Sequence, residues 1–206
     1  GTLVESAVIF SIFIFFGLLL SKRVGFGMPI LEGFLREENQ TDNLKSVVWT
    51  SIGWGIFGGV LIIVMSFLFP DLSITFLKAE TSVATWKGLM ASFYGGIGEE
   101  IFARLFLMTL FVWILSKIKK VQEKQPTNTI IWISIILSSI LFGLGHLPIT
   151  GGVTSITLAV VLRAILLNGV VSVIFGWLYW KKGLESAIIA HFSGDIVIHV
   201  MTPLVA

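Results

Sequence analysis

Three ionisable side chains, Glu99, Glu100 and Arg104, lie within an otherwise apolar run of the chain. Such groups cost about 2.5–3.5 kcal/mol each in a hydrocarbon setting, so three of them within six residues require a chemical reason. On a helix, Glu100 and Arg104 share a face and can form a neutralised pair. Glu99 points about 100° away and has no partner within its own turn. The spacing therefore predicts a structural brace, Glu100 with Arg104, and a carboxylate free for chemistry at Glu99.

The three histidines of the protein also lie in apolar runs. His146 ends one run, and His191, Asp195 and His199 follow one another at four-residue spacing in another, which puts them on one helical face. Ionisable groups in such runs normally turn toward a bundle interior or a water-filled cavity. We therefore expect Glu99 to meet two or three imidazoles and a second carboxylate, contributed by three helices.

These groups suit the hydrolysis of a peptide bond, which needs an activated water, a proton shuttle and donors for the developing oxyanion. A glutamate with an imidazole can deprotonate water, and a second imidazole with a hydrogen-bond donor can hold the oxyanion. The same side chains can bind a divalent metal that activates the water. Routes with a metal such as zinc and without one both stay open, with Glu99, His146 and His191 as candidate ligands.

Transmembrane helices are the elements that must position these groups. The chain has 206 residues, 55% hydrophobic and only 13% charged, and its mean hydropathy is +0.96. These values exclude a soluble domain, and apolar runs of about 18 or more residues without alternation favour helices over strands. We predict an all-α, polytopic bundle of about six spans with a cavity between the helices that carry the ionisable groups. The expected spans are Leu3–Leu20, Val47–Phe69, Leu89–Leu115, Ile130–Leu147, Val153–Trp180 and Gly183–Val205.

We expect one transmembrane domain over residues 1–206, with its core at about 89–202, in the plasma membrane of a bacterium or archaeon. The net charge of +2 does not indicate a nucleic-acid partner, because the basic residues lie in short loops between apolar runs. Their excess in the first, third and fifth loops predicts that these loops face the cytoplasm. The chain has no cysteine, which excludes a disulfide framework, a thiolate nucleophile and a cysteine-bound zinc site.

Local signals predict several details of the spans. Asp42 or Asn43 is expected to cap the second span, and Trp86 to anchor a mixed, interfacial segment before the third. Gly95, Gly96 and Gly98 are expected to weaken or break the third span just before the glutamates and to allow another backbone to approach closely.

The depths of the two histidines differ in this topology. His146 falls near the outer end of its span, whereas His191 falls nearer the cytoplasmic end of its own. For both to meet Glu99, the sixth span must begin outside lipid, or the helices must be tilted or broken.

Other intramembrane and metal protease architectures lack essential parts in this sequence. No His-Glu-x-x-His pattern of a zincin occurs. Ser193 and Gly194 follow His191 and Phe192, so the Gly-x-Ser-Gly nucleophile of rhomboid proteases is absent. A presenilin-like pair needs two aspartates in spans, and only Asp195 qualifies.

Three motifs occur in order, each on an expected span: Glu99-Glu100-x-x-x-Arg104, Phe142-x-x-x-His146 and His191-x-x-x-Asp195. Together they resemble the CAAX protease and bacteriocin-processing family, also called Abi or CPBP, which includes the type II CAAX prenyl endopeptidases. The resemblance covers roughly residues 93–195. It implies an intramembrane endopeptidase acting on a peptide or protein substrate, prenylated or of the bacteriocin-precursor type, at membrane lipid.

The resemblance also implies roles for the motif residues. Glu99 becomes the general base that holds the attacking water with His146, while His191 and Asp195 stabilise the oxyanion. Glu100 and Arg104 brace the site. The last motif position is often Asn in prenyl endopeptidases and is Asp here. An ionised Asp195 repels an oxyanion, so it can serve only if protonated, by orienting His191, or as a metal ligand.

Two alternative functions stay open. A proton- or cation-coupled transporter also carries Glu, His and Asp in its spans, although one glycine break and no repeat count against it. A member of the same family without proteolysis, acting as a membrane scaffold, is the other. A structural role is the favoured reading for His199, and also for Asn168 and Arg163 in the fifth span.

Overall fold

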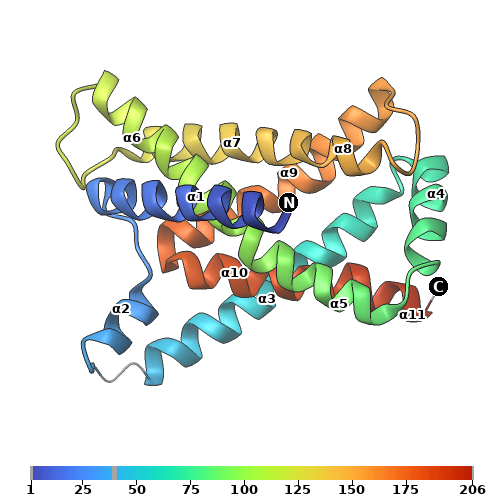
Figure 1. The fold of residues 1–206 in the computed structure, drawn as a ribbon, viewed down its shortest axis with the longest axis horizontal. Helices are drawn as coiled ribbons and strands as arrows, with labels where there is room; N and C mark the ends of the chain where they lie inside the picture. The colour runs from blue at the N-terminus through green and yellow to red at the C-terminus, as the bar shows by residue number, and fades with distance from the viewer. Residues whose placement is uncertain (1, 39–40, 206) are drawn as a thin grey trace.

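The computed structural model describes residues 2–38 and 41–205, and all regular elements within these ranges are helical (Figure 1). Six segments are long and apolar enough to cross a membrane. The predicted polytopic helix bundle is therefore confirmed. In chain order the elements are α1 (Thr2–Val24), α2 (Pro29–Leu35), α3 (Thr41–Ser66), α4 (Pro70–Thr81), α5 (Thr85–Phe93), η1 (Tyr94–Glu99), η2 (Ile101–Met108), α6 (Thr109–Ile118), α7 (Asn128–Gly145), α8 (Leu147–Thr150), α9 (Leu158–Lys182), α10 (Leu184–Asp195), η3 (Ile196–Met201) and α11 (Thr202–Val205).

Helix boundaries differ from the predicted ones where local capping decides them. The fifth span begins at Leu158 rather than Val153, because the Thr157 hydroxyl caps α9 by accepting the backbone N–H of Val160 at 3.3 Å. The first loop contains α2, which was not predicted and which starts with Pro29, a residue favoured at the first helical position. The side chains of Asp42 and Asn43, expected as caps of α3, lie outside the described side chains.

The third span is not interrupted at its glycines, but its helix is irregular there, as a weakened helix would be. α5 continues through η1 and η2, two π-helical stretches, into α6. The wider π turns absorb the irregularity without interrupting the helix, as they often do at functional sites. The close approach expected at these glycines is confirmed: a Cβ added at Gly96 would lie 2.9 Å from Cβ of Phe192 on α10.

α9 lies at the centre of the bundle and packs against both α7 and α10, while α3 packs along α10 (Figure 1). A buried cluster of apolar side chains from η2, α7, α9 and α10 forms the core; it includes Met108, Ile135 and Leu178. Buried hydroxyls join helices across this core, with Ser51 2.7 Å from Ser186. Such small polar contacts replace the hydrophobic driving force that is absent between helices in lipid.

The sixth span begins inside the protein. The backbone N–H of Leu184 donates to the carbonyl of Gly27 at 3.1 Å, and the N–H of Leu31 donates to Oε1 of Glu185 at 2.9 Å. The segment before and within α2 therefore covers the start of α10, and Leu184 is only 2% exposed. With the start of α10 covered in this way, His191, in the second half of α10, lies level with Glu100 from the middle of the third span.

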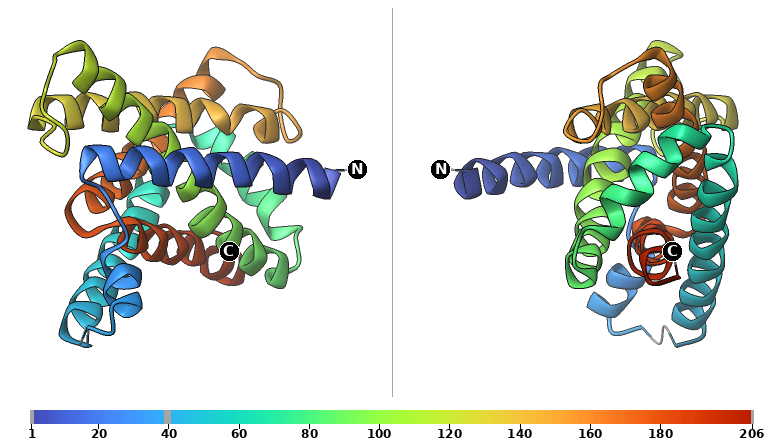
Figure 2. Two further views of the ribbon diagram at one scale, coloured as in Figure 1. Left: turned by 60° about the vertical axis from the view of Figure 1, so that its left-hand side comes forward. Right: turned by 90° about the vertical axis from the view of Figure 1, so that its right-hand side faces the viewer.

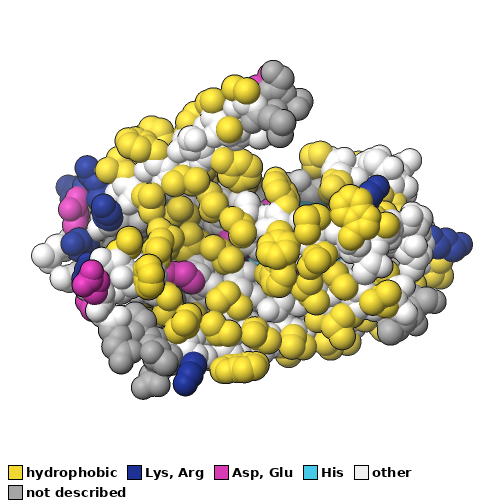
Figure 3. Space-filling model, turned by 60° about the horizontal axis from the view of Figure 1, so that its bottom comes forward, with side chains coloured by type: hydrophobic (Ala, Val, Ile, Leu, Met, Phe, Trp, Pro, Cys, Tyr) yellow, Lys and Arg dark blue, Asp and Glu magenta, His cyan; other side chains and the backbone are white. Residues whose placement is uncertain are grey.

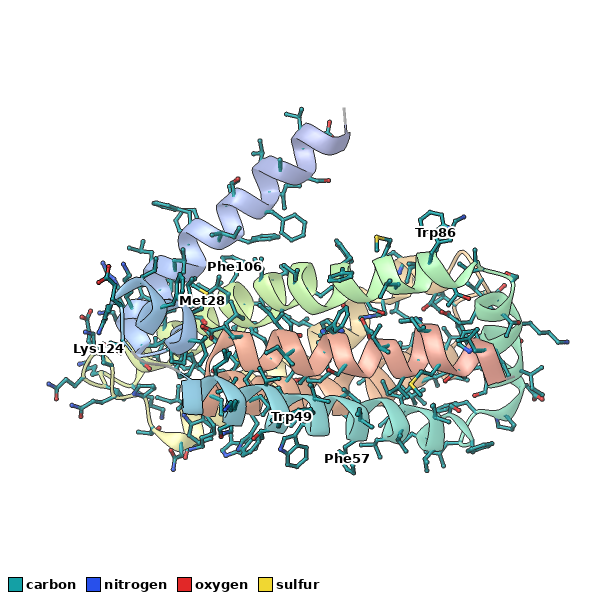
Figure 4. The ribbon with its side chains drawn as sticks, turned by 90° about the horizontal axis from the view of Figure 1, so that it is seen from below. Met28, Trp49, Phe57, Trp86, Phe106 and Lys124 are labelled. Carbon is teal, nitrogen blue, oxygen red and sulfur yellow. The ribbon has the colours of Figure 1, made fainter. Side chains whose placement is uncertain are left out.

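The outward surface of the spans is apolar. Hydrophobic side chains cover most of the face in Figure 3, and Lys and Arg gather mainly at one end. Trp49 and Phe57 point away from the bundle on α3, while Lys124 and Trp86 lie at opposite ends of it (Figure 4). The loops predicted to be cytoplasmic all lie at the Lys124 end (Figure 1). This pattern is that of an integral membrane protein.

α1 departs from the bundle along its length. Its second half packs against η2 and α6, whereas its first half projects away (Figure 2). Figure 3 shows a hollow beside this projecting half, with acidic and histidine side chains visible inside it. Phe10 of α1 meets Tyr94 of η1 edge-on, with ring centroids 6.4 Å apart. The hollow thus adjoins the stretch that carries the glutamates.

Candidate active site

Glu99, His146 and His191 come together from η1, the end of α7 and α10. Oε2 of Glu99 lies 3.9 Å from Nε2 of His146 and 3.9 Å from Nε2 of His191. Both distances are too long for a direct hydrogen bond and suit a water or a substrate atom between the groups. Glu99 and His146 are 27% and 28% exposed, and His191 is 8% exposed. The three groups therefore line a recess that is open on one side.

His146 is oriented by its own helix. Its Nδ1 lies 2.9 Å from the carbonyl oxygen of Phe142. A carbonyl can only accept, so Nδ1 carries the proton, and in the neutral form of the ring Nε2 is the unprotonated nitrogen, on the side of Glu99. The spacing of four residues in the Phe142-x-x-x-His146 motif is what puts this carbonyl within reach, since His146 directly follows α7.

Glu100 is fully buried and contacts two partners. Its Oε1 accepts a hydrogen bond from Nδ1 of His191 at 2.8 Å, and its Oε2 lies 3.1 Å from Nε of Arg104. The second contact is the predicted one; the first was not foreseen. Arg104 makes no aligned hydrogen bond with its guanidinium among the described residues. Its guanidinium lies over the rings of Phe142 and Phe175, at 5.2 and 5.9 Å from their centroids.

Two aromatic rings hold the imidazole of His191. Phe175 stacks on it with centroids 4.7 Å apart and planes at 22°, and Phe142 meets it edge-on at 5.8 Å. Phe142 also meets the ring of His146 edge-on at 4.7 Å. Sequence reasoning missed Phe175, because a phenylalanine in an apolar span carries no local sign that it packs against a polar group.

Asp195 lies next to His191 without bonding to it. Its Oδ1 is 3.6 Å from Nε2 of His191, beyond hydrogen-bond range, and its side chain is 14% exposed. A Cβ added at Gly95 would collide with the Asp195 carboxylate and lie 3.3 Å from Nε2 of His191. A glycine is therefore needed where η1 passes this carboxylate. One role considered for Asp195 was to orient His191. In this structure Glu100 holds that imidazole instead.

The comparisons with known proteins identify the family. The family model described as type II CAAX prenyl endopeptidase Rce1-like matches residues 81–197, more than half of the chain. The chain belongs to this family. No curated protein and no solved structure matches it.

Membership in the Rce1-like family makes the protein a CAAX-type intramembrane protease at the family level, with a peptide or protein substrate. The resemblance drawn from the three motifs is thereby confirmed. The matched region contains all three motifs and the π-helical stretches that carry the glutamates. It ends two residues before His199 and begins one residue after Glu80.

The third histidine of this Rce1-like chain has a different neighbour. Nδ1 of His199 lies 2.7 Å from Oε1 of Glu80 and so joins η3 to α4. No contact with Glu99 occurs for His199 among the described residues. Asn168 donates to the carbonyl of its own helix at Ala164, at 3.1 Å. These two residues are not brought into the Glu99 recess.

The side chains at the recess are of the types that bind a divalent metal, but they are spaced more widely than the ligands of one metal ion. Two imidazole nitrogens and a carboxylate are ordinary zinc ligands, which in a tetrahedral site lie about 3.4 Å from one another. Here Glu99 is 3.9 Å from each imidazole, and no trio of His, Asp or Glu within the described ranges is arranged to hold a metal ion. As placed here, the three groups are spaced more widely than the ligands of one zinc ion.

Proposed function

We propose that this protein hydrolyses a peptide bond of a membrane-associated or prenylated substrate, using a water activated by Glu99 and His146. The observation that carries the proposal is the equal 3.9 Å separation of Glu99 Oε2 from the Nε2 atoms of His146 and His191. One small molecule between these three atoms can contact all of them. Membership in the CAAX protease family supports the same reaction class.

In this proposal Glu99 accepts a proton from the water as its oxygen attacks the scissile carbonyl carbon. The unprotonated Nε2 of His146 accepts the second hydrogen bond of that water and so aims its lone pair. The proton taken by Glu99 then passes to the leaving nitrogen as the carbon–nitrogen bond breaks. The products are a new carboxyl terminus and a free amine, and Glu99 returns to its ionised form.

His191 is the proposed partner of the developing oxyanion. Its Nδ1 is committed to Glu100, so donation from Nε2 requires the imidazolium form of the ring. Asp195 lies beside the same nitrogen and helps the oxyanion only when it carries a proton. Glu100, Arg104 and the two phenylalanine rings hold His191 in place and do not touch the reacting atoms.

The test is cleavage of a quenched peptide panel, prenylated and unprenylated, by the purified protein in lipid nanodiscs. Glu99→Gln should lower the rate at least about 100-fold, the usual worth of a general base, with an unchanged melting temperature. Glu123→Gln, which removes one negative charge at an exposed position, is the control variant. Full activity of Glu99→Gln would refute the role of Glu99. Loss of wild-type activity with a chelator, restored by zinc, would make His146 and His191 metal ligands instead.

A further inference from the structure

Arg163 is a half-buried cation in α9 that lacks a carboxylate. No acidic side chain of residues 4–38 and 44–204 forms an ion pair with it, and its Nε is buried without a hydrogen-bond acceptor. Arg104 differs, because Glu100 lies beside it. An arginine within a span is costly and usually marks a functional site with an anionic partner. The described part of the chain does not supply that partner for Arg163.

Phe76 of α4 lies against this guanidinium. The central carbon of Arg163 lies 4.1 Å from the centroid of the Phe76 ring. The guanidinium carries further N–H groups on its two terminal nitrogens, and these can donate to an acceptor beside the ring. A planar carboxylate can therefore bind edge-on with two parallel hydrogen bonds without displacing the ring.

The packing of α7 on α9 brings Arg163 level with the proposed catalytic recess. A Cβ added at Gly143 would lie 2.9 Å from the carbonyl of Ala164, and one at Gly169 would lie 3.4 Å from the carbonyl of Ser139. The two helices thus run antiparallel with these pairs opposite each other. His146, three residues beyond Gly143, lies level with the turn of α9 that contains Arg163.

α4 contacts both Arg163 and His199, through Phe76 and Glu80 respectively. Phe76 and Glu80 are four residues apart and share a face of α4. Glu80 binds His199, which in turn follows Asp195 by four residues. Arg163 and the motif aspartate are therefore joined by a series of contacts and shared helix faces that runs through Phe76, Glu80 and His199.

We propose that Arg163, seated on Phe76, binds the C-terminal carboxylate of the peptide substrate and thereby sets which bond reaches Glu99. This inference rests on the proposed protease function. A peptide carboxylate is favoured over a lipid phosphate because Arg163 is covered by α4 and lies level with the recess. The interaction lies outside the three sequence motifs.

The test compares peptides that differ only in a free carboxylate or an amide at the C-terminus, prenylated and unprenylated. Binding is measured on Glu99→Gln protein in nanodiscs, so that it does not depend on cleavage, and cleavage is measured on the active protein. Both should favour the free acid by about 10- to 100-fold, the range for charge-assisted hydrogen bonds. Arg163→Gln should remove this preference, and Arg163→Lys should keep part of it. Lys78→Gln, an exposed loss of charge on α4, should leave it intact.

The acid-to-amide ratio does not depend on the amount of folded protein, so a partly unfolded variant still gives an answer. Equal binding of acid and amide peptides, no binding of any acid peptide, or an acid preference that survives in Arg163→Gln would each overturn the proposal. Equal binding together with a dependence on phosphatidylglycerol that Arg163→Gln abolishes would assign the arginine to a lipid phosphate and also overturn it. Acid-selective binding without cleavage would support the carboxylate site and count against the protease function alone.

Discussion

Nδ1 of His191 donates a hydrogen bond to Oε1 of Glu100 at 2.8 Å, across 91 residues of sequence. The second carboxylate of the first motif thus reaches the third motif, while its other oxygen lies beside Arg104. One buried glutamate thereby fixes the ring orientation of the imidazole that faces Glu99. The predicted pair of Glu100 and Arg104 within one helix therefore also links that helix to α10.

Glu100→Gln should impair both stability and cleavage. The amide keeps the size of the side chain and an acceptor for His191 but leaves the buried Arg104 without an anion, which costs about 3–5 kcal/mol. We expect a lower melting temperature and a cleavage rate reduced by about 10- to 100-fold. Thermal unfolding in nanodiscs and cleavage well below the transition measure the two effects. An unchanged melting temperature would contradict a buried charge pair.

Phe175→Leu should weaken the hold on His191 at a modest cost in stability. The substitution keeps an apolar side chain in the core but removes the stacked ring, and we expect about 1–2 kcal/mol of lost stability. Cleavage should fall several-fold more than in Phe57→Leu, which changes an exposed ring on α3. Equal rates for the two variants would show that the stack on His191 has no part in catalysis.

Gly95→Ala and Gly145→Ala form a matched pair on either side of the recess. A methyl group at Gly95 meets the Asp195 carboxylate, whereas one at Gly145 meets nothing within 4 Å. Gly95→Ala should lower stability by about 1–3 kcal/mol and abolish cleavage through displacement of Asp195 and His191. Gly145→Ala should cleave normally, with stability unchanged or raised by about 0.5–1 kcal/mol. Equal cleavage and equal stability of the two variants would contradict the predicted collision at Gly95.

His199→Gln should retain cleavage within about threefold, since the pair it forms with Glu80 is partly exposed and such pairs contribute less than about 1 kcal/mol. His191→Gln should lose cleavage by at least about 100-fold in the same assay. A double-mutant cycle with Glu80→Gln checks the small coupling energy. A loss in His199→Gln as large as in His191→Gln would move His199 into the catalytic group.

The sequence near Glu99 predicted less than the structure shows, because the packing of distant helices also decides the conformation of this segment. The glycines before Glu99 predicted a weakened or broken helix and a close backbone neighbour, because glycine weakens an isolated helix and has no side chain. In the bundle, α10 packs against Gly95 and Gly96 so closely that side chains there would collide. The helix therefore stays continuous and widens to π turns. The stretch indicates that a neighbour lies close, but not that this neighbour is α10, about 95 residues further along the chain.

The sequence alone determined the class of the protein, its six spans and the side chains able to do chemistry. Backbone groups in lipid must bond within a helix, and ionisable residues there are costly enough to stand out. Helical periodicity also predicted that Glu100 and Arg104 lie together. The tertiary structure decided which helices face one another, and so joined Glu100 to His191 and set Phe175 against that ring. Periodicity fixes which residues share a face, but the partner of that face depends on packing over the whole bundle.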